Sequence, residues 1–230
     1  MKVLFIGEGP TDIGHSGMDP DRPRPATGPL AILARKVCPQ IDADSLALRW
    51  VEIARFDPRG KKKGWEAKVA AAILLSARKF DCDGTICIAD RDRQKERLSE
   101  MDAGLQRGLG QVGSEHAAVC GVAIESIEAW ALGAPSALAA ELEEEVKTIQ
   151  REYRLKEVEQ FCESSGKEEH RPKGLLERLA QLVHRSDGTD FRQAVAERTD
   201  ISELEKNCQD GFKPFADALR TAFASPPLSS

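Results

Sequence analysis

The sequence predicts an α/β fold, with a parallel four-stranded sheet flanked by helices and followed by a helical extension. Short apolar runs alternate with helical patterns over the first 135 residues, and such alternation is typical of parallel strands joined by right-handed crossovers. Two of the runs end directly in carboxylates. No strand-like run follows residue 135. We therefore divide the chain into an α/β domain, 1–135, and a helical extension packed on it, 136–230.

Each predicted element rests on a local pattern. Apolar runs rich in strand-favouring residues and bounded by turn residues predict strands at 3–6, 46–56, 85–89 and 119–124. Helical spacing, with Thr27 or Gly28 beginning the first helix and Pro39 ending it, predicts helices at 28–38, 65–79 and 91–109. A long proline-rich loop is predicted at 14–29. In the extension, helices are predicted at 138–162, 173–184, 191–198 and 212–223.

Composition limits the class of protein. Hydrophobic residues make up 41% and charged residues 31% of the chain, which is typical of a soluble globular protein. No apolar run approaches the roughly 18 residues that a membrane span needs, so we expect no membrane association. The six cysteines form no CxxC pair and no signal peptide is evident, which favours reduced thiols and a cytoplasmic location.

Three carboxylates follow predicted strands. Glu8 lies in the turn after the first strand, and Asp90 and Asp92 follow the third. A lone Glu8 could be an ordinary solvated turn residue, but open α/β sheets bind their ligands at the carboxyl ends of the strands. Like charges brought together need a compensating cation or proton. The three residues therefore predict a divalent metal site, for Mg²⁺ or Mn²⁺, which prefer such oxygen ligands.

Two further carboxylates and a lysine are candidates for the same site. Glu125 and Glu128 follow the fourth strand and are three residues apart, so on a helix they share a face. Either could bind metal or orient a water, or could simply face the positive end of a helix dipole; we expect Glu125 among the metal ligands. Lys173 could stabilise transition-state charge, or be a plain surface lysine.

A basic run is the candidate for holding phosphates. The net charge of -5 cannot attract nucleic acid through the overall field, so binding must use local basic groups. The densest run consists of Arg59, Lys61, Lys62 and Lys63. With Arg22, Arg24 and Arg91 as helpers, this run could clamp phosphates, although such runs are usually solvated loops.

The motifs resemble those of the Toprim (topoisomerase–primase) superfamily. The match comprises Glu8, Gly9, Thr11 and Asp12 in GEGPTD, and Asp90 with Asp92 in IADRDR. The segment AIESIEAWALG resembles one in small stand-alone bacterial Toprim-like proteins, some of them tied to defence against phage. A Pro-Lys pair opening a later helix, here Pro172-Lys173, also occurs there. The resemblance covers residues 1 to about 135, and little of the rest.

The resemblance implies a Toprim-like sheet and a metal-dependent nuclease. In that case Glu8, Asp90, Asp92, Glu125, Glu128 and Lys173 are the catalytic candidates. Phosphodiester hydrolysis needs neutralised charge and an activated water, which Mg²⁺ or Mn²⁺ supplies. The only tyrosine, Tyr153, lies far from the motifs, so hydrolysis is favoured over covalent strand passage.

Two other functions stay open. One is a non-catalytic Toprim-like subunit that binds nucleic acid or a partner ATPase. The other is a phosphatase or nucleotide-processing enzyme, since Asp-x-Asp is a general device for binding metal and phosphate. The sequence does not distinguish DNA from RNA, or endonuclease from exonuclease.

Overall fold

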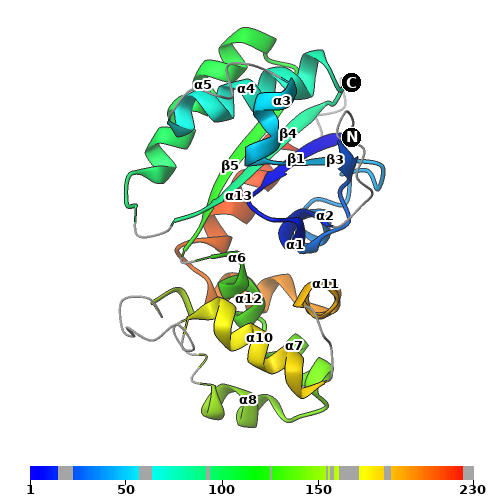
Figure 1. Ribbon diagram of the computed structural model, residues 1–230, viewed down its shortest axis with the longest axis vertical. Helices are drawn as coiled ribbons and strands as arrows, with labels where there is room; N and C mark the ends of the chain where they lie inside the picture. The colour runs from blue at the N-terminus through cyan, green and yellow to red at the C-terminus, as the bar shows by residue number, and fades with distance from the viewer. Residues whose placement is uncertain are drawn as a thin grey trace, which may run out of the picture.

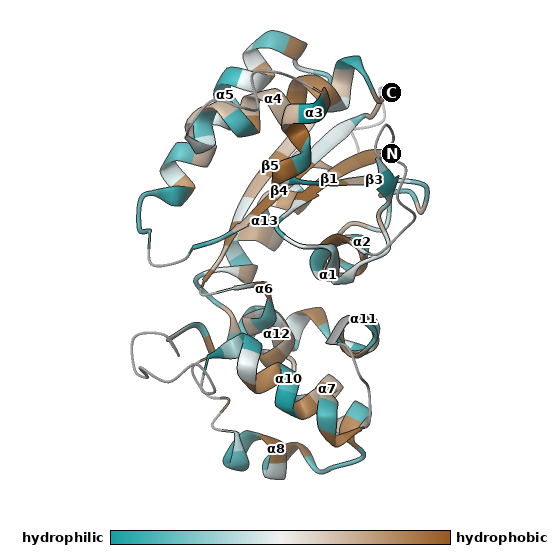
Figure 2. Ribbon diagram, viewed as in Figure 1, coloured by the Kyte–Doolittle hydropathy of each residue, from teal (hydrophilic) through white to brown (hydrophobic). Residues whose placement is uncertain are grey.

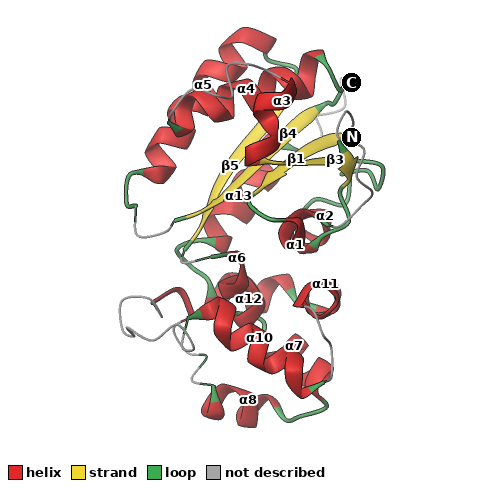
Figure 3. Ribbon diagram, viewed as in Figure 1, coloured by secondary structure: helices red, strands yellow, loops and turns green. Residues whose placement is uncertain are grey.

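The chain forms a five-stranded sheet with helices on both faces and a layer of helices beyond one edge (Figures 1 and 3). The computed structural model describes residues 1–14, 23–56, 64–91, 94–124, 126–153, 155, 158–160, 171–183 and 188–224. The strand order is β2-β3-β1-β4-β5. The α/β class expected from the sequence is therefore confirmed.

The four predicted strands are all present and run parallel. They are β1 (Val3–Gly7), β3 (Leu46–Arg49), β4 (Gly84–Asp90) and β5 (Ala117–Ala123). A two-residue strand, β2 (Arg24–Pro25), pairs antiparallel with β3 and adds a fifth. The sheet is thus mixed rather than wholly parallel, because part of the segment expected to be an irregular loop pairs with the β3 edge.

The sheet is buried on both faces. Alternate residues of β1 belong to different apolar clusters: Val3 and Phe5 to one, Leu4 and Ile6 to the other, as expected from the two-residue period of a strand. The first face is covered by α2 (Pro29–Val37) and α13 (Phe212–Ala222), and the second by α4 (Trp65–Arg78) and α5 (Arg97–Val112). Figure 2 shows β1 hydrophobic along its length.

The last helix of the described chain lies against the strand β5. The ring of Phe215 is so close to Gly121 that a Cβ there would lie 2.7 Å from it. A glycine inside a strand permits such close approach. The C-terminal residues therefore complete one face of the sheet (Figure 1).

The remaining C-terminal elements form the helical layer. In the described residues after 135, no strand occurs and the elements are α7 (Pro135–Leu142), α8 (Val146–Glu152), η3 (Val158–Gln160), α10 (Pro172–Leu182), α11 (Gly188–Arg198) and α12 (Ile201–Asn207). The described residues there are helical, and Pro172 takes the first helical position of α10, as expected.

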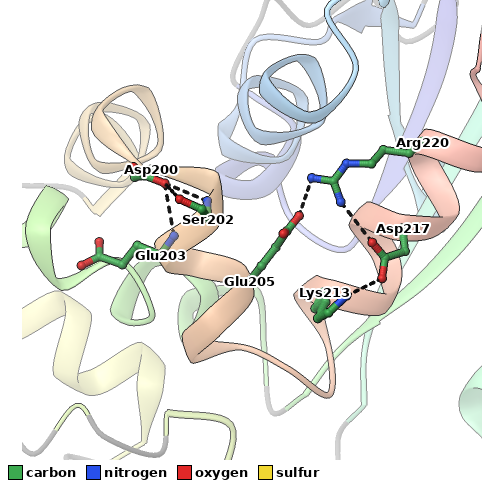
Figure 4. Close-up of polar contacts among 7 residues, drawn as sticks. All are labelled: Asp200, Ser202, Glu203, Glu205, Lys213, Asp217 and Arg220. Carbon is green, nitrogen blue, oxygen red and sulfur yellow. Dashed lines mark hydrogen bonds and ion pairs between the residues drawn. The ribbon is translucent and has the colours of Figure 1, made fainter.

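The helix α12 was not expected from the sequence. Asp200 begins it by accepting hydrogen bonds from the backbone amides of Ser202 and Glu203 (Figure 4), which is a standard N-cap. Glu205 of this helix forms an ion pair with Arg220 of α13. This surface pair joins the helical layer to the helix that covers the sheet.

Three predicted boundaries are wrong. The helical stretch expected at 138–162 is divided in the described residues into α7, α8 and η3, because Glu143 adopts a left-handed conformation that ends α7. The strand expected at 46–56 ends at Arg49 and continues as a 3-10 turn, η1 (Trp50–Glu52), and then α3 (Ile53–Phe56). The cause is Glu52, whose carboxylate accepts the Arg49 backbone N–H at 2.8 Å and turns the chain. The helix expected from residue 91 begins at Arg97 instead, because the Arg91 N–H donates to the Ala123 carbonyl and extends the sheet edge.

Five cysteines can be described, and all are buried free thiols: Cys38, Cys82, Cys87, Cys120 and Cys208. The expectation of free thiols is confirmed for these five, and Cys162 lies outside the described residues. No helix in the described part of the chain is long and apolar enough to cross a bilayer.

Candidate active site

Glu8 and Asp90 meet at the carboxyl edge of the sheet. The strands β1 and β4 are neighbours, and Ile6 pairs with Cys87 in register. Glu8 follows the last residue of β1, and Asp90 is the last residue of β4. The Oε1 atom of Glu8 accepts a long hydrogen bond, 3.4 Å, from the backbone N–H of Asp90. Two predicted ligands, 82 residues apart in sequence, are thus brought together by parallel pairing.

The side chain of Asp90 is oriented by a helix. Its Oδ1 atom accepts a 3.1 Å hydrogen bond from the backbone N–H of Ile127, the first residue of α6 (Ile127–Leu132). A first-turn amide has no partner within its own helix, so a carboxylate readily accepts from it. Asp90 therefore joins the end of β4 to the segment that leaves β5.

Glu8 is reachable from solvent and lies near a buried cation. Its side chain is 39% exposed, and Arg97 Nη1 lies 4.0 Å from its Oε1 atom. Arg97 is itself held over the ring of Trp65, 4.9 Å from the ring centroid.

A second group of charges lies just behind this edge. Arg192 Nη1 is 2.8 Å from Glu128 Oε1 and 4.0 Å from Asp12 Oδ1. All three side chains are buried. Asp12 belongs to α1 (Pro10–Ile13), directly after the Glu8 turn, and its Oδ2 atom accepts the Gly9 N–H at 2.8 Å. Burial raises the pKa of Asp12 to about 6, although the Gly9 hydrogen bond opposes the shift.

Glu128 thus has a different environment from the one expected. It was a candidate for binding metal or orienting water, and the structure places it in a buried ion pair with Arg192. Asp92 and Glu125, the other predicted carboxylates, lie outside the described residues.

The predicted basic residues contribute little that can be described. Lys173 is exposed in the first turn of α10 and forms no hydrogen bond or ion pair with the described residues. Arg91 lies at the sheet edge, one residue after Asp90. The basic run, Arg59, Lys61, Lys62 and Lys63, lies outside the described residues.

Two other arginines lie at the edge. Arg49 ends β3 and pairs in register with Gly7, the residue before Glu8. Its Nη2 atom is 3.0 Å from Glu52 Oε1, and Arg24 Nη2 contacts the same oxygen at 2.5 Å. One buried carboxylate thus holds two arginines, leaving this corner of the edge with a net positive charge.

Sequence reasoning missed Arg192 and Arg49. A signal for Arg192 existed: it lies between the buried residues Phe191, Val195 and Ala196 on one side of α11. An arginine on the apolar side of a helix needs a carboxylate partner. The sequence does not reveal which one.

A small cavity adjoins the buried charges. Its volume is about 20 Å³, and its lining includes Thr11, Glu128, Arg192 and Trp130. That is room for about one water molecule. Arg192 Nε and Trp130 Nε1 are buried without a hydrogen-bond partner in the described protein.

The described residues do not by themselves make a metal site. No group of three or more His, Cys, Asp or Glu suited to a metal ion occurs among the described residues. Glu8 and Asp90 supply hard oxygen atoms at one place, which suits Mg²⁺ or Mn²⁺. A metal site at this edge would need further donors, for which Asp92 and Glu125, outside the described residues, are the predicted candidates.

The chain matches no known protein family, no curated protein and no solved structure. Its function must therefore be inferred from the site.

Proposed function

We propose that the protein is a divalent-metal-dependent phosphodiester hydrolase that cleaves nucleic acid, as a Toprim-type nuclease does. The observation that carries the proposal is the contact between Glu8 and Asp90 at the carboxyl edge of two parallel strands. Open α/β sheets bind their ligands at this edge. Two acidic residues whose strand ends are held together by this bond, from the Asp90 backbone N–H to the Glu8 carboxylate, are better suited to a cation than to an apolar ligand.

In this proposal Glu8, Asp90 and Asp92 hold Mg²⁺ or Mn²⁺, with Glu125 beside them. The bound ion supplies charge neutralisation on the phosphate and a more acidic water. The Ile127 N–H orients Asp90, and the Arg97 guanidinium lies 4.0 Å from the Glu8 carboxylate. Arg49, next to Gly7 in the sheet, is placed to contact the phosphate backbone.

The resemblance extends the proposal to the setting of the protein. A cytoplasmic role in defence against phage, alone or with a partner ATPase, agrees with a nuclease. It is supported by the motifs alone.

The test is hydrolysis of single- and double-stranded DNA and RNA, and of a small phosphomonoester, with Mg²⁺, Mn²⁺ or EDTA. Glu8→Gln and Asp90→Asn should each lower nuclease activity by more than about a hundredfold, since even outer-shell partners of a metal are worth about 10- to 100-fold. The matched control is Glu66→Gln, which removes an exposed carboxylate paired with Arg107 and should leave the rate unchanged.

Each alternative has its own outcome. Cleavage of the monoester alone would favour a phosphatase. Binding of nucleic acid without cleavage, unchanged in the Glu8 and Asp90 variants, would favour a non-catalytic subunit. Either result, or nuclease activity that survives both substitutions, would contradict the proposal.

A further inference from the structure

Arg192 is the point where the helical layer touches both halves of the candidate site. It lies on α11, which packs against α1, α2 and α6 (Figure 1). Its side chain is 6% exposed. One atom, Nη1, faces Asp12 of α1 and Glu128 of α6 at 4.0 and 2.8 Å.

Each of these carboxylates is linked to one of the predicted metal ligands. Asp12 accepts the backbone N–H of Gly9, the residue after Glu8. Glu128 follows Ile127, whose backbone N–H donates to Asp90. From Arg192 the path to either ligand is therefore one ionic contact, one hydrogen bond and a peptide link.

We propose that Arg192, a residue of the C-terminal part of the chain, is a positioning residue. It keeps the Glu8 turn and the Asp90 side chain in their positions relative to each other. The expected effect of Arg192 on catalysis rests on the proposed function, whereas its effect on the backbone segments at Gly9 and Ile127 does not. Without the guanidinium, Asp12 and Glu128 would be two buried carboxylates facing each other without their cation, an arrangement strongly destabilised by repulsion and desolvation. The segments α1 and α6 would then separate.

The first test is hydrogen exchange of the intact protein, followed in peptides that contain Gly9 and Ile127. In Arg192→Met, both amides should exchange about tenfold faster or more. An amide exchanges when its segment opens locally, and a hydrogen bond to a charged group opposes that opening. Glu128→Gln weakens only the α6 side, so the Ile127 peptide should exchange faster while the Gly9 peptide stays as in the wild type.

The matched control is Arg198→Met, which removes an arginine from the same helix. Arg198 pairs with Glu141 of α7 and contacts neither segment of the site. Exchange of both peptides should be unchanged in it. If Arg192→Met does not fold, by circular dichroism, Arg192→Gln replaces it, since glutamine keeps a donor but not the charge. Wild-type exchange of both peptides in the folded variant would overturn the proposal, as would equal loosening by Arg198→Met.

The second test concerns the metal. In the folded Arg192 variant, the Mn²⁺ concentration for half-maximal cleavage should rise about tenfold or more, because the ligands are no longer held in place. An unchanged Mn²⁺ requirement would contradict the positioning role in catalysis. If the wild-type protein cleaves no substrate, the proposed function fails, and the exchange result still decides whether Arg192 positions the two segments.

Discussion

Asp12 makes the stability of the protein depend on pH in an unusual direction. Burial and, to a smaller extent, the charge of Glu128 together raise its pKa from 3.8 to about 6, against the opposing effects of the Gly9 hydrogen bond and the charge of Arg192. The folded protein therefore binds a proton more tightly at this site than the unfolded chain. The contribution of Asp12 to stability is fully present below pH 3.8 and is lost as the pH rises through about 6.

The substitution Asp12→Asn isolates this contribution. Asparagine keeps the shape and an oxygen acceptor for the Gly9 N–H but cannot titrate. A shift of about two pKa units, at about 1.4 kcal/mol each, gives a change of about 3 kcal/mol. Relative to Asp12→Asn, the wild-type free energy of unfolding should fall by about that amount between pH 3.8 and 6, the window the pKa values define.

The assay is urea unfolding of both proteins at half-unit steps from about pH 2 to about 7.5. Asp217→Asn is a control of opposite sign, because hydrogen bonds from Lys213 and Arg220 lower the pKa of Asp217. Its contribution is present above pH 3.8 and is lost as the pH falls. A wild-type minus Asp12→Asn difference that is flat, or that rises with pH, would refute the reasoning.

Three further predictions follow from packing and charge. Gly28→Ala should destabilise the protein by about 2 kcal/mol or more, because the added Cβ would lie 2.3 Å from the Gly14 backbone nitrogen. At Gly110 an added Cβ would have no atom within 4 Å, so Gly110→Ala should stabilise α5 by about 0.5–1 kcal/mol. Urea unfolding measures both changes. Phe215→Ala should cost about 3–5 kcal/mol in the same assay, and a loss below about 1 kcal/mol would contradict close packing on β5. The last prediction replaces three lysines of the basic run, Lys61, Lys62 and Lys63, by alanine. The slope of log binding constant against log salt concentration for nucleic acid should become shallower by about 0.9 per lost phosphate contact, and metal binding should not change. An unchanged slope would exclude these lysines as the phosphate clamp.

The strands were predictable where burial on both faces forces a continuous apolar run. That holds for residues 3–6 and 85–89, which lie inside strands, and for the predicted strand 119–124, of which all but the last residue lies in β5. The segment 46–56 is also apolar, but a short apolar run does not distinguish strand from helix. What decides it is tertiary: Trp50 donates its indole N–H to the Ile88 carbonyl, and Glu52 captures the Arg49 N–H.

The part of the site that lies at the ends of strands could be predicted from the sequence. Glu8 and Asp90 could be placed together because parallel strands end at the same edge. The role of Arg192 could not be predicted, since its partners Asp12 and Glu128 are 180 and 64 residues away in the chain. Pairing at that separation depends on how the helical layer packs, and amphipathic patterns do not specify a partner.

The position of α13 also determines when the protein can fold during synthesis. The β5 surface around Gly121 stays uncovered until Phe215 and its neighbours have left the ribosome, long after both Glu8 and Asp90 have been translated. An apolar sheet face exposed for that time is a target for chaperones and a source of aggregation. The late arrival of this helix should make folding slow, because the contact that completes the sheet is so distant in sequence. A nascent chain would carry both carboxylates well before it could hold them in place.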